Sequence, residues 1–153
     1  MRLKANSLRL YHETNEDNAS KILQSGRMYR GRGGWAGPGI YFAKTPAATH
    51  AKSHNKGVVL SADVLLGTVK YVSGTETGLS NTCFTNLQAE GFDSVCITAS
   101  HSGEEYVVYN YDQVQNIQRF NELQENSEMA WILPSSQNLV PILNPNQLYL
   151  VDF

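Results

Sequence analysis

A strand-like run that begins directly behind two carboxylates constrains this chain more than any other segment. Glu104 and Glu105 precede residues 106–109, which read Tyr-Val-Val-Tyr, and this aromatic and β-branched run predicts a β-strand. Because side chains alternate along a strand, Glu105 shares one side with Val107 and Tyr109, so that side can line a cleft while the other packs. Such a strand would hold an acid in a fixed place. The alternative is that the two carboxylates only solvate the strand end.

Two upstream segments favour the cleft over the solvated strand end. Residues 8–14 alternate and deliver His12 to the end of a predicted strand, just before a polar run. A helix should follow, with Asp17 or Asn18 as its N-terminal cap and Gly26 at its end. The sequence therefore predicts a strand, then a helix, with a histidine where the first element ends.

The second segment is a glycine-rich loop at residues 31–39, which runs into a short apolar strand that carries Tyr41. Glycines let a backbone approach a ligand closely. The loop lacks the GxGxxG pattern of a dinucleotide-binding Rossmann fold, and no long helix follows it. Instead, residues 45–53 predict a second, short helix with Thr45 as its cap and Pro46 in its first turn.

The order of the predicted elements favours an α+β fold. Further strand-like segments, separated by glycine or polar turns, cover residues 58–66, 68–72, 93–97, 105–110 and 114–120. With two short helices among six or more strands, we expect two small, mainly antiparallel sheets that pack face to face and leave a split for a ligand. Residues 73–90 are polar and predict a surface loop. The tail at 121–153 contains enough apolar residues to pack on the domain, with an interaction segment as the alternative.

Composition agrees with a single globular domain over residues 1–153, with 41% hydrophobic and 17% charged residues. A net charge of −2 without a dense basic block argues against a large nucleic-acid footprint and leaves a local patch open. Cys83 and Cys96 lack the spacing of a zinc site, and His50 and His54 lack a third ligand, so we expect no metal. No apolar run reaches membrane-spanning length, so we expect a soluble chain without a membrane partner.

Four short motifs, taken together, resemble a known family. They are Tyr-His-Glu-Thr at 11–14, Gly-Ile-Tyr-Phe-Ala at 39–43, Gly-Phe-Asp-Ser-Val at 91–95 and Glu-Tyr-Val-Val-Tyr-Asn at 105–110. In this order they are similar to the signatures of the poly(ADP-ribose) polymerase (PARP) catalytic domain, over roughly residues 8–118. That family belongs to the diphtheria-toxin-like ADP-ribosyltransferases, whose active sites carry a histidine, a tyrosine and a glutamate. The resemblance implies that His12, Tyr41 and Glu105 are the catalytic residues.

The resemblance also implies the reaction, in which ADP-ribose is transferred from NAD to an acceptor and nicotinamide is released. We expect the transfer of a single ADP-ribose unit, with a protein as the acceptor. Glu105 would stabilise positive charge on the ribose, Tyr41 would stack on the nicotinamide ring and His12 would bond the adenosine ribose. The glycine-rich loop would cover the cofactor with Arg32 facing the pyrophosphate, and Thr49 would bond the carboxamide oxygen. The cofactor-binding residues implied in this way are His12, Glu13, Thr14, Arg32, Gly39, Tyr41 and Thr49.

Two positions depart from the family pattern. Glu13 stands where the family usually has glycine, and Lys52, which cannot stack, stands where many members place a second stacking tyrosine. These departures leave two alternatives, a module that binds NAD or ADP-ribose without turnover and an NAD glycohydrolase. A tRNA phosphotransferase of the related superfamily is disfavoured, because that family depends on basic residues where this chain has Tyr41 and Glu105. We expect a monomer in the cytoplasm or nucleus. Two alternatives stay open, namely delivery into a host cell as an effector and a nucleic acid as the acceptor.

Overall fold

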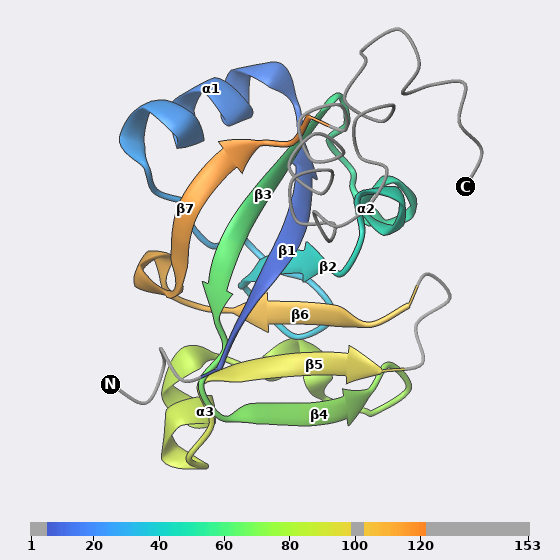
Figure 1. Cartoon of the computed structure of the whole chain (residues 1–153). Helices are drawn as coiled ribbons and strands as arrows, with labels where there is room; N and C mark the ends of the chain where they lie inside the picture. Colours follow the sequence, from blue (N-terminus) through green and yellow to red (C-terminus); the bar gives the residue numbers. More distant parts are fainter. Residues whose placement is uncertain (1–5, 99–102, 122–153) are drawn as a thin grey trace, which may run out of the picture. The chain divides into compact units, whose positions relative to one another are not determined.

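The computed structural model describes residues 6–98 and 103–121, which form an α+β arrangement of strands, α-helices and short 3₁₀ helices (Figure 1). In chain order the elements are β1 (Ser7–Thr14), α1 (Glu16–Ser25), β2 (Ile40–Ala43), α2 (Pro46–Lys52), β3 (Val58–Leu65), β4 (Val69–Ser73), η2 (Leu79–Asn81), α3 (Phe84–Ala89), β5 (Ser94–Thr98), β6 (Glu105–Val108), η3 (Tyr111–Gln113) and β7 (Val114–Arg119). The described residues up to Phe120 belong to one unit, Met1–Phe120. The predicted packing of the tail at 121–153 concerns residues that, Asn121 apart, lie outside the described part of the chain.

The strands form one mixed seven-stranded sheet in the order β4-β5-β6-β2-β1-β3-β7. The prediction of two small sheets packed face to face is therefore wrong. The pair of Tyr11 with Ala43 joins β1 to β2 and makes the hydrogen-bonded order continuous. By contrast, β1 and β3 pair along all eight residues of β1. In Figure 1 the strands β1, β3 and β7 run across the direction of β4, β5 and β6, so the sheet changes direction at the β1–β2 junction.

The strands β4 and β5 are parallel, whereas the other neighbouring strands are antiparallel. A parallel pair needs a crossover connection, and residues 79–89 supply it with η2 and α3. The prediction of an irregular loop at 73–90 is therefore wrong for this part, and the described chain has three α-helices rather than two. Helix α3 forms because Leu87 is fully buried in an apolar cluster, and Phe84, one turn earlier, packs against the same cluster.

The two helices predicted from the sequence both form. Helix α1 begins after Asn15, whose side-chain oxygen accepts a hydrogen bond from the Asn18 amide at 2.8 Å, so the prediction of Asp17 or Asn18 as the cap is wrong by a few positions. The helix ends at Gly26, as predicted, in the left-handed conformation with a φ of 66°. Helix α2 has the predicted cap, because the Thr45 hydroxyl accepts a hydrogen bond from an amide of the first turn. None of the described helices combines the length and apolarity needed to cross a membrane.

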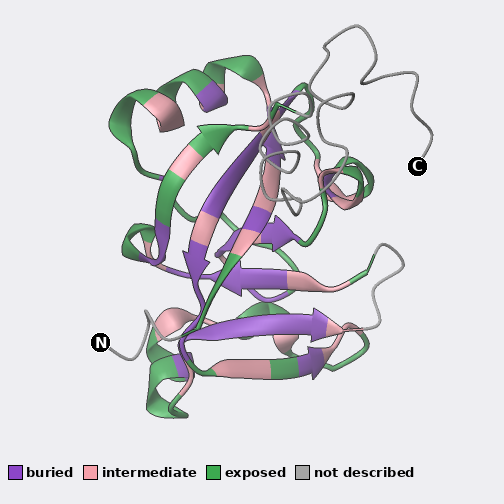
Figure 2. Ribbon diagram, viewed as in Figure 1, coloured by how far each residue is buried: buried purple, intermediate pink, exposed green. Residues whose placement is uncertain are grey.

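Two buried apolar clusters share strand β6. Tyr106 and Val108 belong to one, with side chains from β1, β2, β3 and α1, and Val107 and Tyr109 belong to the other, with side chains from β4, β5 and α3. Because these residues alternate along the chain, the two clusters lie on opposite faces of β6. Both faces are therefore packed along most of the strand (Figure 2), and the predicted open face is limited to the partly exposed Glu105 at its start.

Candidate functional site

Three neighbouring strands carry the three residues predicted to be catalytic. Glu105 begins β6, Tyr41 lies in β2 and His12 lies near the end of β1, and these strands are consecutive in the sheet. In the β2–β6 register, Tyr41 pairs with Val107, and Ala43 pairs with Glu105. Because side chains two positions apart in a strand share a face, Tyr41 and Glu105 are diagonal neighbours on one face of the sheet. The fold therefore brings three residues that are far apart in the sequence onto neighbouring strands, with Tyr41 and Glu105 on one face of the sheet and the His12 ring against Phe42.

The His12 imidazole is held by the neighbouring strand. Its Nδ1 atom lies 2.7 Å from the backbone oxygen of Tyr41, and its ring packs against Phe42 with the two ring centroids 5.9 Å apart. Because a carbonyl oxygen only accepts, Nδ1 carries the hydrogen and Nε2 is an acceptor in the neutral ring. Burial lowers the pKa of His12, although the hydrogen bond with Tyr41 and the nearby Glu13 carboxylate oppose this effect. The imidazole is therefore neutral at neutral pH, and Nε2 can accept a hydrogen bond from a ligand hydroxyl.

The Tyr41 hydroxyl holds the glycine-rich loop against the sheet. It donates a hydrogen bond to the Gly37 oxygen at 2.6 Å and accepts one from the Ala36 amide at 2.9 Å. Burial raises the pKa of Tyr41 to about 12, so the hydroxyl stays protonated. The loop comes so close that a Cβ atom added at Gly34 would lie 2.2 Å from the Tyr41 hydroxyl oxygen. Glycine is therefore required at this position by the close approach of backbone and ring.

The same loop is fixed at further points. The Tyr109 hydroxyl donates a hydrogen bond to the Ala36 oxygen at 2.7 Å. A Cβ atom at Gly39 would lie 2.4 Å from Cγ1 of Val107, so this predicted binding residue is also needed for packing against β6. Arg32, which the resemblance places against a pyrophosphate, is exposed in the loop. The loop therefore presents an exposed guanidinium on an anchored backbone.

Glu105 lies beside a lysine that the sequence did not connect to it. The Lys52 Nζ atom is 3.9 Å from Oε2 of Glu105 and donates a hydrogen bond to the Gly103 oxygen at 3.0 Å. Both side chains are largely buried, with 12% of the Lys52 side chain and 16% of the Glu105 side chain exposed. Burial raises the pKa of Glu105, an effect that Lys52 opposes, and burial lowers the pKa of Lys52, an effect that Glu105 opposes. Each group therefore favours the charged form of the other in a poorly solvated place.

Glu13 and Thr49, both predicted to bind the cofactor, contact each other. The buried Glu13 carboxylate accepts a hydrogen bond from Nδ1 of His50 at 2.9 Å. It also lies 3.3 Å from Oγ1 of Thr49, whose one hydrogen is shared with the Pro46 oxygen at 2.6 Å. Thr14 is also buried, and its Oγ1 accepts a hydrogen bond from Nδ2 of Asn18 at 3.4 Å. The side chains of Glu13, Thr14 and Thr49 therefore form hydrogen bonds within the protein, and their contacts with a cofactor stay predictions.

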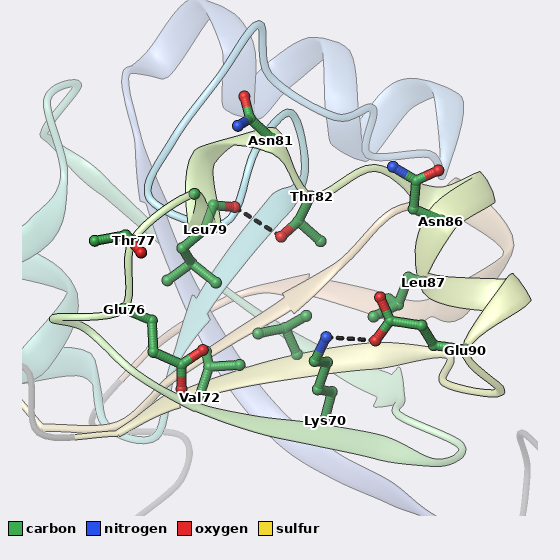
Figure 3. Close-up of a pocket in the computed structure, with 12 residues that line it drawn as sticks. Lys70, Val72, Glu76, Thr77, Leu79, Asn81, Thr82, Asn86, Leu87 and Glu90 are labelled. Atoms are coloured by element: carbon green, nitrogen blue, oxygen red, sulfur yellow. Dashed lines mark hydrogen bonds and ion pairs between the residues drawn. The ribbon is translucent and has the colours of Figure 1, made fainter.

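A separate polar pocket of about 250 Å³ lies between β4, α3 and the segment at 76–82 (Figure 3). Lys70 of β4 and Glu90, just after α3, form an ion pair there. The described residues that line the pocket are Lys70, Val72, Glu76, Thr77, Gly78, Leu79, Asn81, Thr82, Asn86, Leu87, Glu90 and Val95. No predicted site residue is among them. The sequence signal that could have indicated this region is the helical spacing of Phe84 and Leu87 within the polar stretch.

The chemistry of these three side chains suits an organic ligand. A neutral imidazole, a phenol ring and a poorly solvated carboxylate can bond hydroxyl groups, face a planar ring and stabilise positive charge. Within the described residues, no three or more His, Cys, Asp or Glu side chains gather in the way that holds a metal ion. Comparison of the chain with models of known protein families and with curated proteins finds no match. Family membership therefore rests on the sequence motifs and is a proposal.

Proposed function

We propose that this chain is a PARP-like ADP-ribosyltransferase, which transfers a single ADP-ribose unit from NAD to a protein acceptor and releases nicotinamide. The observation that supports the proposal best is the position of His12, Tyr41 and Glu105 on the consecutive strands β1, β2 and β6. The resemblance assigns these same three residues to one bound dinucleotide, and Tyr41 and Glu105 share a face of the sheet.

The proposed reaction breaks the bond between C1′ of ribose and the ring nitrogen of nicotinamide. The bonding electron pair goes to the cationic ring nitrogen, which becomes neutral, so the leaving group needs no acid to protonate it. Positive charge builds on the ribose as an oxocarbenium-like ion while the acceptor forms a new bond to C1′. The proton of a neutral acceptor passes to a base. The reaction therefore demands an anion close to C1′.

An ionised Glu105 meets this demand. A carboxylate stabilises a developing cation most strongly where solvent is excluded, and the Glu105 side chain is largely buried. It can also bond ribose hydroxyls and accept the proton of the acceptor. Burial raises the pKa of Glu105 above the ordinary value of a glutamate, so Glu105 takes up its proton at a higher pH than an exposed glutamate does. The proposed activity should therefore be lost under acidic conditions.

Tyr41 and His12 would orient the dinucleotide. The Tyr41 ring offers a face for nicotinamide, and the bonds of its hydroxyl with the loop restrict the motion of the ring. Nε2 of His12 is an acceptor in the tautomer that the structure fixes, so it suits a ribose hydroxyl. Arg32 suits the pyrophosphate, because a guanidinium matches phosphate oxygens in pairs.

Labelled NAD tests the proposal. Wild-type protein should release nicotinamide and label itself or an added protein, and Glu105→Gln should lower the rate of nicotinamide release by about 100-fold or more. Glu104→Gln is the matched control, because Glu104 is the adjacent carboxylate and forms an ion pair with Lys44 instead. This control should release nicotinamide at close to the wild-type rate. Equal turnover by the wild type and Glu105→Gln would refute the assignment of Glu105.

A second candidate is a module that binds NAD or ADP-ribose without turnover. The Lys52 ammonium, 3.9 Å from Glu105, favours this candidate, because a cation there repels both a cationic nicotinamide ring and a positively charged ribose. Calorimetry distinguishes the two functions, since heat of NAD binding without nicotinamide release would support the module. Nicotinamide release without any labelled protein would instead indicate an NAD glycohydrolase.

A further inference from the structure

Glu13 is a buried carboxylate that the proposed chemistry does not use. Its side chain is 2% exposed, and a buried charge destabilises a fold unless hydrogen bonds compensate for the lost water. Its two oxygens accept hydrogen bonds from Nδ1 of His50 at 2.9 Å and from the Gly57 amide at 3.2 Å. Oγ1 of Thr49 lies 3.3 Å from the same carboxylate and shares its one hydrogen with the Pro46 oxygen at 2.6 Å. The carboxylate is therefore well compensated, one residue after His12.

The partners of Glu13 lie on α2 or shortly after it. A further contact reaches the C-terminal cap of the helix, where Oγ of Ser53 donates a hydrogen bond to the backbone oxygen of Glu13 at 2.9 Å. Helix α2 has seven residues, and a helix this short depends on tertiary contacts for its position. Thr49 is the residue that α2 buries, and its hydroxyl faces Glu13. Glu13 therefore ties both the middle and the end of α2 to β1.

The last residue of α2 is Lys52, which contacts Glu105 as described above. Lys52 follows Thr49 by one turn, so a shift or rotation of α2 moves the Lys52 ammonium relative to Glu105. The distance between Lys52 and Glu105 therefore depends on where α2 is held. A second pair of opposite charges lies nearby, because the adjacent Glu104 carboxylate is paired with Lys44.

We propose that Glu13 is a positioning residue that fixes α2 against β1 and thereby holds the Lys52 ammonium beside the Glu105 carboxylate. The placement needs no substrate, and its consequence for turnover rests on the proposed function. An ammonium at this distance favours the ionised form of Glu105, which the transfer requires. It also disfavours a cationic ring in the same place. Through α2, Glu13 sets the balance between these two effects.

A double-mutant cycle on the pKa of Glu105 tests the proposal without NAD. Titration of ¹³C-labelled carboxylates by NMR would follow Glu105 in the wild type, Lys52→Met, Glu13→Ala and the double variant. Lys52→Met should raise the Glu105 pKa, because the ammonium lowers it. Glu13→Ala should raise it in the same direction, and the double variant should match Lys52→Met. Removal of the Glu13 charge alone would lower the Glu105 pKa, so a rise reports displacement of Lys52.

Further variants keep the test decisive. Glu13→Gln retains an oxygen acceptor for α2 and should return the Glu105 pKa towards the wild-type value. If Glu13→Ala does not fold, Thr49→Val combined with Ser53→Ala removes two hydroxyl groups that contact Glu13 and should give a rise in the same direction. Asp17→Asn, which removes an exposed acid from α1, should leave the Glu105 pKa unchanged.

Three results would each overturn the proposal. They are a Glu105 pKa that does not respond to Lys52→Met, one that stays unchanged or falls when the α2 anchor is removed, and additive rises in the double variant. None of these results depends on turnover, so a protein that never releases nicotinamide would refute the proposed function and leave the positioning role standing. In an active protein, the acid limb of the kcat/KM profile should move to higher pH in both Lys52→Met and Glu13→Ala.

Discussion

Tyr41 contributes to the fold through its hydroxyl and to the proposed site through its ring. The hydroxyl bonds to Gly37 and Ala36 of the glycine-rich loop, so the ring and the loop hold each other in place. His12 also has one role in the fold and one in the proposed site, because its Nδ1 donates a hydrogen bond to the backbone oxygen of Tyr41 while Nε2 can accept one from a ligand. Substitutions of these residues change the structure and the site together. Variants at the surrounding glycines separate the effect on the structure from the effect on the site better.

Gly34→Ala should push the glycine-rich loop away from Tyr41. The added Cβ would lie 2.2 Å from the Tyr41 hydroxyl oxygen and 2.4 Å from its Cζ atom, so either the ring or the loop must move. We expect a loss of about 1–3 kcal/mol in the free energy of unfolding, measured by urea denaturation. Gly57→Ala is the matched control, because Gly57 also has a positive φ, of 129°, and nothing lies within 4 Å of its Cβ position. Equal stability of the two variants would contradict the close packing of the loop on Tyr41.

The protein should lose stability as the pH falls below the ordinary pKa of histidine, because of His12. Burial lowers the pKa of His12 in the folded chain below the ordinary value of 6.5, so the unfolded chain binds this proton more readily. The stabilising contribution of neutral His12 is therefore complete above pH 6.5 and is lost as the pH falls towards the lower, folded pKa.

Urea denaturation between about pH 7.5 and about pH 5 measures this effect. The difference in the free energy of unfolding between the wild type and His12→Asn should shrink as the pH falls. His54→Asn, at an exposed position, is the control and should show no such trend. A difference between the wild type and His12→Asn that stays constant with pH would contradict the lowered pKa of His12.

The sequence predicts where the candidate residues lie along the chain better than it predicts their partners. The strands of His12, Tyr41 and Glu105 follow from alternation and from nearby glycines, which are local signals. The contact of Glu13 with His50 joins residues 37 positions apart, and the bond of Lys52 with Gly103 spans 51 positions. No short-range pattern encodes such contacts, because they depend on how α2 packs against the sheet.

Among the elements, the connection from β4 to β5 differs most from the sequence-based expectation. Its polar composition favours a loop, but parallel strands need a connection that crosses over the sheet. Helix α3 forms within that connection because burial of Leu87 outweighs the unfavourable local composition. The ends of α1 and α2 are easier to predict, because Gly26 and Thr45 act through local backbone geometry.

Leu87→Ala should destabilise the crossover and with it the parallel strand pair. Leu87 is 1% exposed and is the residue that α3 buries, so its truncation leaves a cavity beside β5. We expect a loss of about 2–5 kcal/mol in the free energy of unfolding, measured by urea denaturation. Gln88→Ala changes the next, exposed residue of the same helix and should cost little. A similar effect of both substitutions would contradict the packing of α3 through Leu87.

Over the whole described unit, Gln113 links strands from both parts of the sheet. Its Nε2 donates hydrogen bonds to the oxygens of Leu65, at the end of β3, and Asp93, just before β5. Its Oε1 accepts hydrogen bonds from the amides of Tyr109 and Asn110, which follow β6. A buried amide can satisfy donors and acceptors at once, so glutamine suits this position better than an acid does.

Gln113→Glu should therefore destabilise the entire unit. The ionised carboxylate offers no donor and would face the two backbone oxygens that Nε2 now bonds. We expect a loss of roughly 3 kcal/mol or more in the free energy of unfolding, measured by urea denaturation at neutral pH. Gln115→Glu, an exposed position in β7, is the matched control and should have a small effect. Comparable stability of both variants would contradict the bridging role of Gln113.

The fold class could be predicted from the sequence, but the continuity of the sheet could not. The α+β class follows from the order of strand-like and helix-like segments, which is visible along the chain. One pair, Tyr11 with Ala43, decides whether the strands make two sheets or one. A single contact of this kind has no sequence pattern of its own, so the two-sheet expectation fails there.

The junction between β1 and β2, which rests on one residue pair, has a thermodynamic consequence for a liganded protein. His12 lies on the β1 side, and Tyr41 and Glu105 lie on the β2–β6 side, with the Tyr11–Ala43 pair and the imidazole hydrogen bond spanning the two. A ligand held by all three side chains would add noncovalent links at the weakest-paired place in the sheet. Saturation with such a ligand should raise the melting temperature and sharpen the transition, because the two groups of strands would then melt together.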